Sequence, residues 1–117
     1  MTRIYLAGPM SGLPEFNYPA FNEAAAQLRA RGFIVENPAE NQQPPCGSWE
    51  GYMRLSLTQM LACDCVVLLP GYRASKGASV ENLVASYLKI PRYSIEDALQ
   101  FDYKLRDRCA KQAEVTK

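Results

Sequence analysis

The sequence of 117 residues predicts an α/β fold in which helices cover both faces of a parallel sheet. Two observations predict this fold. Short apolar runs alternate with segments of helical periodicity along the chain, which is typical of consecutive β-α-β units. Residues 65–69 are continuously apolar, as expected for a central strand that is buried on both sides. We expect a single domain over residues 1–117, because domains commonly contain about 100–200 residues.

The first apolar run covers residues 3–7 (RIYLA) and predicts a strand, because a Gly-Pro pair ends it. A loop rich in glycine, proline and serine follows and reaches about Tyr18. Helical spacing then places four apolar residues on one face: Phe21, Ala24, Ala25 and Leu28. Gly32 predicts the end of this helix, and residues 33–35 predict the second strand.

A polar segment with three prolines, residues 38–47, predicts a surface loop. Ser48 can cap the helix that follows, which we expect to reach about Ala62. After the third strand, residues 65–69, another helix is predicted. Its expected apolar face contains Val80, Leu83, Val84, Tyr87 and Leu88.

A short fourth strand is predicted over residues 92–94, and a last helix over about residues 95–111. Ser94 and Asp97 resemble a capping box at the start of this helix. Asp64 precedes the third strand, on the edge opposite the expected ligand loops, so we interpret it as structural.

The chain contains no histidine, which excludes Ser-His-Asp and Cys-His catalysis. A general acid or base must then be a carboxylate, a tyrosine, a lysine or a cysteine. The four cysteines lack the spacing of a zinc knuckle, and we interpret them as small apolar side chains in a reducing compartment. We therefore expect no metal site.

The charge balance also argues against a nucleic-acid-binding function. Thirteen basic and twelve acidic residues give a formal net charge of +1, whereas proteins that bind nucleic acids usually carry a basic surplus. The start of the chain has too short an apolar run for a signal peptide, and no apolar run reaches about 18 residues. We expect a cytoplasmic protein that binds neither nucleic acid nor membrane.

Ligands of open parallel α/β sheets bind beyond the carboxyl ends of the strands. Three predicted loops meet at that edge: residues 8–12, 37–40 and 70–77. The first contains Gly8, Ser11 and Gly12 and can present backbone N–H groups to an anion, although an ordinary turn explains it equally well. No loop matches a dinucleotide or P-loop motif, so we expect no cofactor.

The segment S-K-G-A-S-V-E, residues 75–81, opens the third predicted helix and ends on a carboxylate. We expect Glu81 in the first helical turn, where the helix dipole favours an acidic residue and can by itself explain it. Its expected place at the margin of the apolar face, near a strand end, instead favours a functional carboxylate. The dipole would keep this group ionised at neutral pH, as a nucleophile requires.

Several other side chains each have two interpretations. Ser56 falls on the apolar face of the second predicted helix, where it can bond to a backbone carbonyl or face a pocket. Trp49 and Tyr52 can pack in the core or stack on a planar base. Arg73 and Lys76 can contact a phosphate or remain solvated loop charges.

Four motifs together resemble a known family: I-Y-L-A-G-P-M-S-G, S-W-E-G-Y-M, C-V-V-L-L-P-G and S-K-G-A-S-V-E. They are similar to a phage and prophage domain of unassigned function. That domain resembles the nucleoside 2-deoxyribosyltransferases and the deoxynucleoside 5′-monophosphate N-glycosidases. The resemblance covers roughly residues 3–95. It implies a flavodoxin-like (Rossmann-like) three-layer sandwich with strand order 2-1-3-4, with or without a fifth strand.

The resemblance also implies roles for individual residues. Glu81 matches the nucleophilic glutamate that attacks the anomeric carbon, and Tyr5 matches the tyrosine that orients this carboxylate. Ser75 matches the position that contacts the 5′-phosphate in the monophosphate glycosidases. Ser11 and Gly12 match the first loop on their phosphate side.

Ser56 departs from the family pattern, because the enzymes have an aspartate there that positions the sugar or protonates the leaving base. A second carboxyl group is therefore unassigned, and the choice between Glu40 and Glu50 stays open. The glycines of the first and third loops, Gly8 and Gly77, complete the expected substrate-binding residues.

The sequence therefore predicts an N-glycosidase or a deoxyribosyltransferase-like enzyme that acts on a nucleoside or nucleotide. Ser75 favours a 5′-monophosphate. Ser56 motivates a second hypothesis, a nucleotide-binding module without turnover. The proline-rich loop and the terminal helix motivate a third, a protein-interaction element of phage growth. Because the relatives complete their sites across subunits, the resemblance also implies a homo-oligomer.

Overall fold

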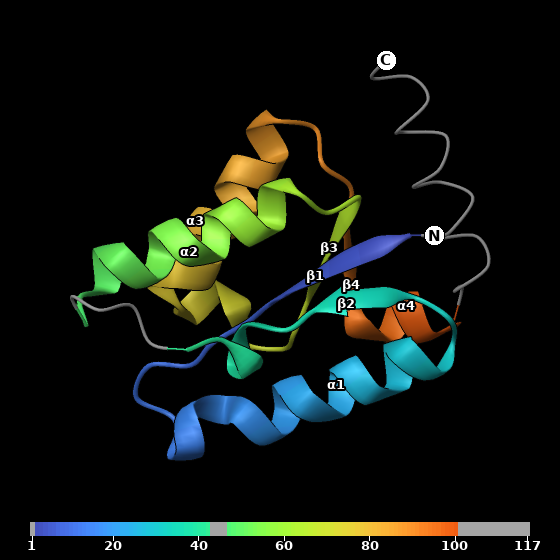
Figure 1. Cartoon of the computed structure of the whole chain (residues 1–117), viewed down its shortest axis with the longest axis horizontal. Coiled ribbons are helices and arrows are strands. Elements are labelled where there is room, and N and C mark those ends of the chain that lie inside the picture. Colours follow the sequence, from blue (N-terminus) through green and yellow to red (C-terminus); the bar gives the residue numbers. More distant parts are fainter. Residues whose placement is uncertain (1, 43–46, 101–117) are drawn as a thin grey trace.

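The computed structural model describes residues 2–42 and 47–100, and its centre is a sheet of four parallel strands (Figure 1). The strands are arranged in the order β2 (Ile34–Glu36), β1 (Arg3–Ala7), β3 (Cys65–Leu68) and β4 (Arg92–Ser94). The predicted parallel sheet and its strand order are confirmed. The second strand lies one residue later than predicted, and the third ends one residue earlier.

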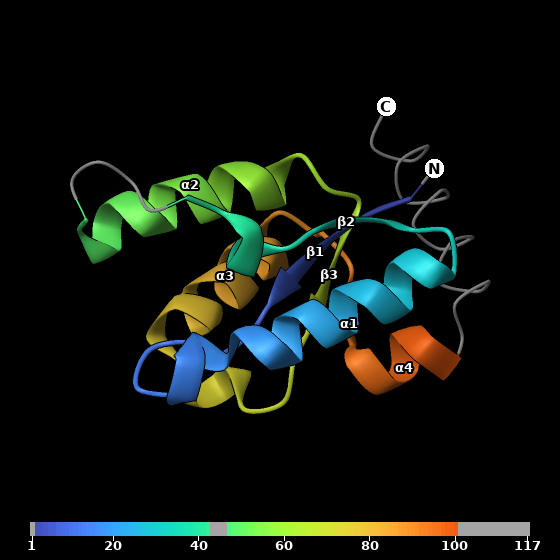
Figure 2. The ribbon, with the colours of Figure 1, turned by 60° about the horizontal axis from the view of Figure 1, so that its bottom comes forward.

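Two helices cover each face of the sheet (Figures 1 and 2). On one face lie α1 (Tyr18–Ala30) and α4 (Ile95–Gln100), and on the other lie α2 (Trp49–Leu61) and α3 (Lys76–Tyr87). The sandwich therefore has the three layers that the sequence predicts. The last helix begins as predicted, and its predicted part from residue 101 onward lies outside the described residues.

Alternation along β1 divides the core into two parts. Ile4 and Leu6 face α1 and α4, where the predicted apolar face of α1 is buried throughout. Tyr5 and Ala7 point to the opposite side, toward α2 and α3. The position of Tyr5 within the strand thus places a polar hydroxyl in the layer between the sheet and α3.

The predicted apolar face of α3 is only partly right: Val84 packs against the core, whereas three other members are exposed. Leu83, Tyr87 and Leu88 are 55 %, 79 % and 55 % exposed. The buried face contains Ala78, Glu81 and Ala85, which recur at the spacing of one helical face. The two alanines have small side chains, so α3 can pack close to the sheet, whereas Leu83, Tyr87 and Leu88 face outward.

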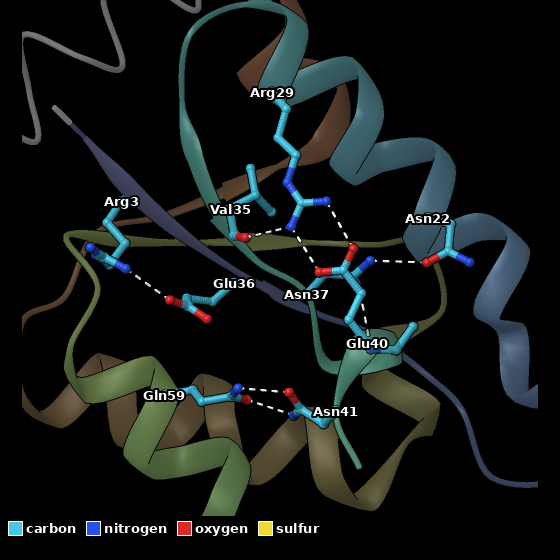
Figure 3. A network of polar contacts seen from close by, with 10 residues as sticks. Arg3, Asn22, Arg29, Val35, Glu36, Asn37, Glu40, Asn41 and Gln59 are labelled. Carbon is cyan, nitrogen blue, oxygen red and sulfur yellow. Dashed lines mark hydrogen bonds and ion pairs between the residues drawn. The ribbon is translucent and has the colours of Figure 1, made fainter.

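Side chains fix the loop after β2 in place (Figure 3). Arg29 of α1 donates two hydrogen bonds to Glu40 at 2.8 and 2.9 Å, and a third to the Val35 carbonyl. Asn41 and Gln59 of α2 exchange two amide hydrogen bonds, both 2.7 Å long. The loop is therefore bonded to helices on both faces of the sheet.

The amino edge of the sheet has its own polar contact. The Asp64 carboxylate accepts a hydrogen bond from the Arg3 backbone N–H at 2.7 Å, which agrees with a structural role. At the start of α4, the Ser94 hydroxyl accepts from the Asp97 N–H, as the capping pattern predicts. Within residues 2–42 and 47–100, no helix has both the length and the apolar character needed to cross a membrane.

Gly8, directly after β1, is required by packing. A Cβ atom at this position would lie 2.8 Å from the Cβ of Leu69, closer than such atoms approach in real structures. We predict that Gly8→Ala lowers the free energy of unfolding by about 1–3 kcal/mol, the usual cost of overpacking a core. Urea unfolding at pH 7 measures this loss.

A double-mutant cycle controls this prediction. Leu69→Gly removes the whole side chain, including the Cβ atom that the added methyl group would meet. The double variant should therefore be more stable than the sum of the two single losses predicts. Additive losses, or a Gly8→Ala variant as stable as the wild type, would contradict the packing argument.

Candidate active site

Glu81 lies in the second turn of α3, on the face that packs against the sheet. The helix begins at Lys76, and the Ser75 hydroxyl caps it by accepting a hydrogen bond from the Ala78 N–H at 3.2 Å. The prediction that Glu81 falls in the first turn is therefore wrong, because the helix starts earlier than its apolar pattern suggests. The preference for acidic residues in a first turn no longer explains this glutamate.

The Glu81 side chain is buried against β1. Its exposed fraction is 5 %, and that of Tyr5 is zero. The Tyr5 hydroxyl donates a hydrogen bond to Oε2 of Glu81. Two residues that the sequence analysis singled out are thus in direct contact, although 76 positions separate them along the chain.

Burial raises the pKa of Glu81 to about 7, although the hydrogen bond from Tyr5 acts in the opposite direction. Burial therefore outweighs the expected effect of the helix dipole, and the carboxyl group titrates near neutral pH instead of being fully ionised there. Desolvation is the largest influence on the pKa of Glu81, because this residue lies beyond the first turn and forms no ion pair within the described residues. Burial and the neighbouring Glu81 also hold the pKa of Tyr5 well above its usual value.

A partly open hollow borders this pair. Its volume is about 410 Å³, counted with the open space at its mouth, and both Tyr5 and Glu81 line it. It lies beside the loops after β1 and β3, at the edge where parallel sheets bind ligands. Four of the six expected substrate-binding residues also line it: Gly8, Ser11, Ser75 and Gly77.

The other two expected substrate-binding residues lie away from the wall of the hollow. Gly12 is exposed in a turn with φ +80°, with open space around it. Ser56 is fully buried, and its hydroxyl donates to the backbone carbonyl of Tyr52 at 3.0 Å. Of the two interpretations of Ser56, the structure shows the bond to a backbone carbonyl. Its hydroxyl also lowers the pKa of Tyr5 and Tyr52, which places it near both phenols.

The remaining wall is apolar and aromatic. Helix α2 contributes Trp49, Tyr52 and Met53, so both aromatic candidates line the hollow. Met53 shares their helical spacing, and this signal could have identified it. A Cβ atom on Gly77 would approach the Met53 sulfur to 3.2 Å, so the glycine lets α2 and α3 come close together. Met10 and Pro38 also line the hollow: the loops that contain them were expected at this edge, but no pattern singled out these two side chains.

Neither candidate for a second carboxylate lines the hollow. Glu40 is paired with Arg29, which lowers the pKa of this carboxyl group, and Glu50 is exposed at the start of α2. Among the described residues, Glu81 is the single carboxylate of the wall. No group of three histidine, cysteine, aspartate or glutamate side chains that could hold a metal occurs within residues 2–42 and 47–100.

The two candidate cations contact aromatic rings. The Lys76 ammonium lies 4.2 Å from the ring centre of Trp49. The Arg73 guanidinium lies over Tyr72, and its Nε donates to the Tyr72 hydroxyl at 3.2 Å. Neither cation lines the hollow, but Lys76 contacts an aromatic residue that does.

Comparisons with known proteins show a family match and a similar solved structure. A family model described as "Domain of unknown function (DUF4406)" matches residues 2–93. A solved structure of a 2-deoxyribosyltransferase from the psychrotolerant bacterium Bacillus psychrosaccharolyticus is similar, with a TM-score of 0.65 and 26 % sequence identity. The match covers 80 % of this chain and 71 % of that chain, and it confirms the expected flavodoxin-like fold. No curated protein matches the chain.

The raised pKa of Glu81 makes stability depend on pH. The folded protein holds this proton up to about pH 7, whereas the unfolded chain releases it near the usual value of 4.5. Stability therefore falls as pH rises through this interval, by about 3 kcal/mol at most, since each factor of ten in proton affinity is worth about 1.4 kcal/mol. We predict that Glu81→Gln, which carries no charge, is more stable than the wild type at pH 8.

Urea unfolding of both proteins between pH 4.5 and pH 8 measures this difference. The advantage of Glu81→Gln should shrink as the pH falls. Glu50→Gln replaces an exposed carboxylate and serves as the control, with no such gain. A constant difference between Glu81→Gln and the wild type at all pH values would contradict the prediction.

Proposed function

This chain belongs to the family of the domain of unknown function (DUF4406), and we propose that it breaks the N-glycosidic bond of a nucleoside or nucleotide through Glu81. One observation carries this proposal. A buried carboxylate, held by a tyrosine hydroxyl, lines a hollow at the ligand-binding edge of the sheet. The similarity to a 2-deoxyribosyltransferase supports the same class of reaction, hydrolysis or deoxyribosyl transfer.

The geometry provides the nucleophile of a retaining mechanism. Tyr5 donates to Oε2 of Glu81, which fixes the carboxylate and leaves Oε1 available. In the proposed step, a carboxylate oxygen bonds to the anomeric carbon while the bond from this carbon to the base breaks. The electron pair of the broken bond moves to the base nitrogen. Water, or the nitrogen of a second base, then displaces the carboxylate from the sugar.

The walls of the hollow suggest what it binds. Trp49 and Tyr52 offer aromatic surfaces on which a planar base can stack. The hydroxyl groups of Ser11 and Ser75 can donate hydrogen bonds to a phosphate. These groups support a deoxynucleoside 5′-monophosphate as the substrate.

The absence of a second carboxylate from the described wall favours one alternative, a module that binds nucleotides without turnover. Positioned proton transfer commonly contributes about 10²–10⁴-fold to a rate, so its loss would leave a slow enzyme or a binding protein. Calorimetry with the same nucleotides separates the two functions, because the alternative gives heat of binding without release of a free base.

Incubation with the four deoxynucleoside 5′-monophosphates and the corresponding nucleosides tests the proposal. We expect release of the free base, detected by chromatography, and a loss of at least about 1000-fold in Glu81→Ala. Tyr5→Phe should retain more activity than Glu81→Ala, because it removes the orienting bond and keeps the nucleophile. Glu50→Ala is the control and should match the wild type.

The pH profile gives a further check. A nucleophilic Glu81 must be ionised, and its pKa is about 7, so kcat/KM should rise through neutral pH and level off above about pH 8. The absence of base release from every substrate at high enzyme concentration between pH 6 and pH 9 would refute the proposal.

A further inference from the structure

Tyr52 carries a hydroxyl donor that has no strong acceptor. It reaches the hollow from α2, and its hydroxyl donates to the sulfur of Met10 at 3.1 Å. A thioether is a weak acceptor, so the free molecule leaves most of the donor strength of this phenol unused. Glu81 is close enough for its charge to raise the pKa of Tyr52.

Two hydroxyl groups close to that of Tyr52 or Glu81 already donate hydrogen bonds within the protein. Tyr5 donates to the Glu81 carboxylate, and Ser56 donates to the backbone carbonyl of Tyr52. A hydroxyl group has a single proton to donate. The Tyr5 donor is held by a carboxylate, whereas the Tyr52 donor is held only by a weak acceptor and can turn to a ligand at little cost.

The chemistry of the proposed function needs such a donor. When the bond to the anomeric carbon breaks, the base nitrogen receives an electron pair, and the ring of the base gains negative charge. Glu81 forms the new bond, so it does not serve as donor in the same step. The described part of the wall contains no other carboxylate, lysine or arginine.

We propose that the Tyr52 hydroxyl donates a hydrogen bond to the departing base and stabilises its negative charge, in place of an acidic side chain at position 56. This inference rests on the proposed function. Tyr52 is then a catalytic residue, because it contacts the reacting group directly.

The donor keeps its own proton. Burial raises the pKa of Tyr52 to about 12, so the phenol stabilises charge by hydrogen bonding and does not act as a net acid. The departing base takes its proton from water. The hydroxide equivalent that remains is consumed when water hydrolyses the ester between Glu81 and the sugar, so protons balance over the cycle.

The role of the donor can be tested with two leaving groups. 2′-Deoxyguanosine 5′-monophosphate releases a base that departs with negative charge. Its 7-methyl derivative carries a positive charge on the base, which therefore departs neutral and needs no donor. We expect Tyr52→Phe to lower kcat/KM about 100-fold for the first substrate and less than about threefold for the second.

Tyr72→Phe is the matched control. Tyr72 is also half-buried and its hydroxyl is also hydrogen-bonded, but it does not line this hollow, so both rates should be unchanged. Equal losses of Tyr52→Phe on both substrates would overturn the proposal and assign Tyr52 a packing role. Unchanged rates on both would overturn it as well. Failure of the wild type to release base from either substrate would instead reject the proposed function, and this inference with it.

A second measurement does not depend on the folding of a variant. In the wild type, the donor should reduce the ratio of kcat/KM between the methylated and the parent substrate, which we call the advantage of the methylated substrate. The spontaneous hydrolysis of the methylated substrate is subtracted first. The enzymatic advantage should be about 10²–10⁴-fold smaller than the advantage of the same methylated substrate in spontaneous hydrolysis, whereas an enzymatic advantage as large as the spontaneous one would show that no donor acts on the base. Such a result would overturn the proposal.

Discussion

The hydrogen bond between Tyr5 and Glu81 is the contact on which the site depends. A buried carboxylate is unfavourable unless a partner satisfies it, and within the described residues no cation pairs with this one. Tyr5 can be that partner because alternation along β1 turns it toward α3. The small residues Ala78 and Ala85, on the same helical face as Glu81, let α3 approach closely enough for the contact.

The two faces of the sheet have different tasks. The core against α1 and α4 is built from large apolar side chains such as Ile4, Phe21 and Leu28, and it supplies most of the hydrophobic burial. The core against α2 and α3 is smaller. At the carboxyl edge of the sheet, this core gives way to the hollow, which polar and sulfur-containing side chains line. One face therefore mainly stabilises the fold, so the other can accommodate a hollow and a carboxylate whose ionisation opposes folding.

Periodicity predicts some of this structure and misses some of it for identifiable reasons. An apolar run located β1, and regular spacing identified the buried face of α1, because packing there is simply hydrophobic. The same rule was only partly right for α3, because Ala78 and Ala85 determine how the helix docks, and Leu83 and Tyr87 are left exposed. Glu40 forms an ion pair with Arg29 instead of lining the hollow, and no pattern in the sequence indicates this contact. Met10 enters the wall from an irregular loop, so no period could reveal it.

The low polarity around Glu81 has opposite effects in the free protein and in the proposed reaction. In the free protein, burial penalises the ionised carboxylate, and its pKa rises to about 7. During glycosidic cleavage the sugar gains positive charge, and the same weak screening strengthens its attraction to the carboxylate. A carboxylate in water would ionise more readily but would stabilise that charge less. Burial of Glu81 therefore reduces the stability of the folded protein, and in the proposed reaction it would strengthen an electrostatic interaction at the moment when the bond to the base breaks.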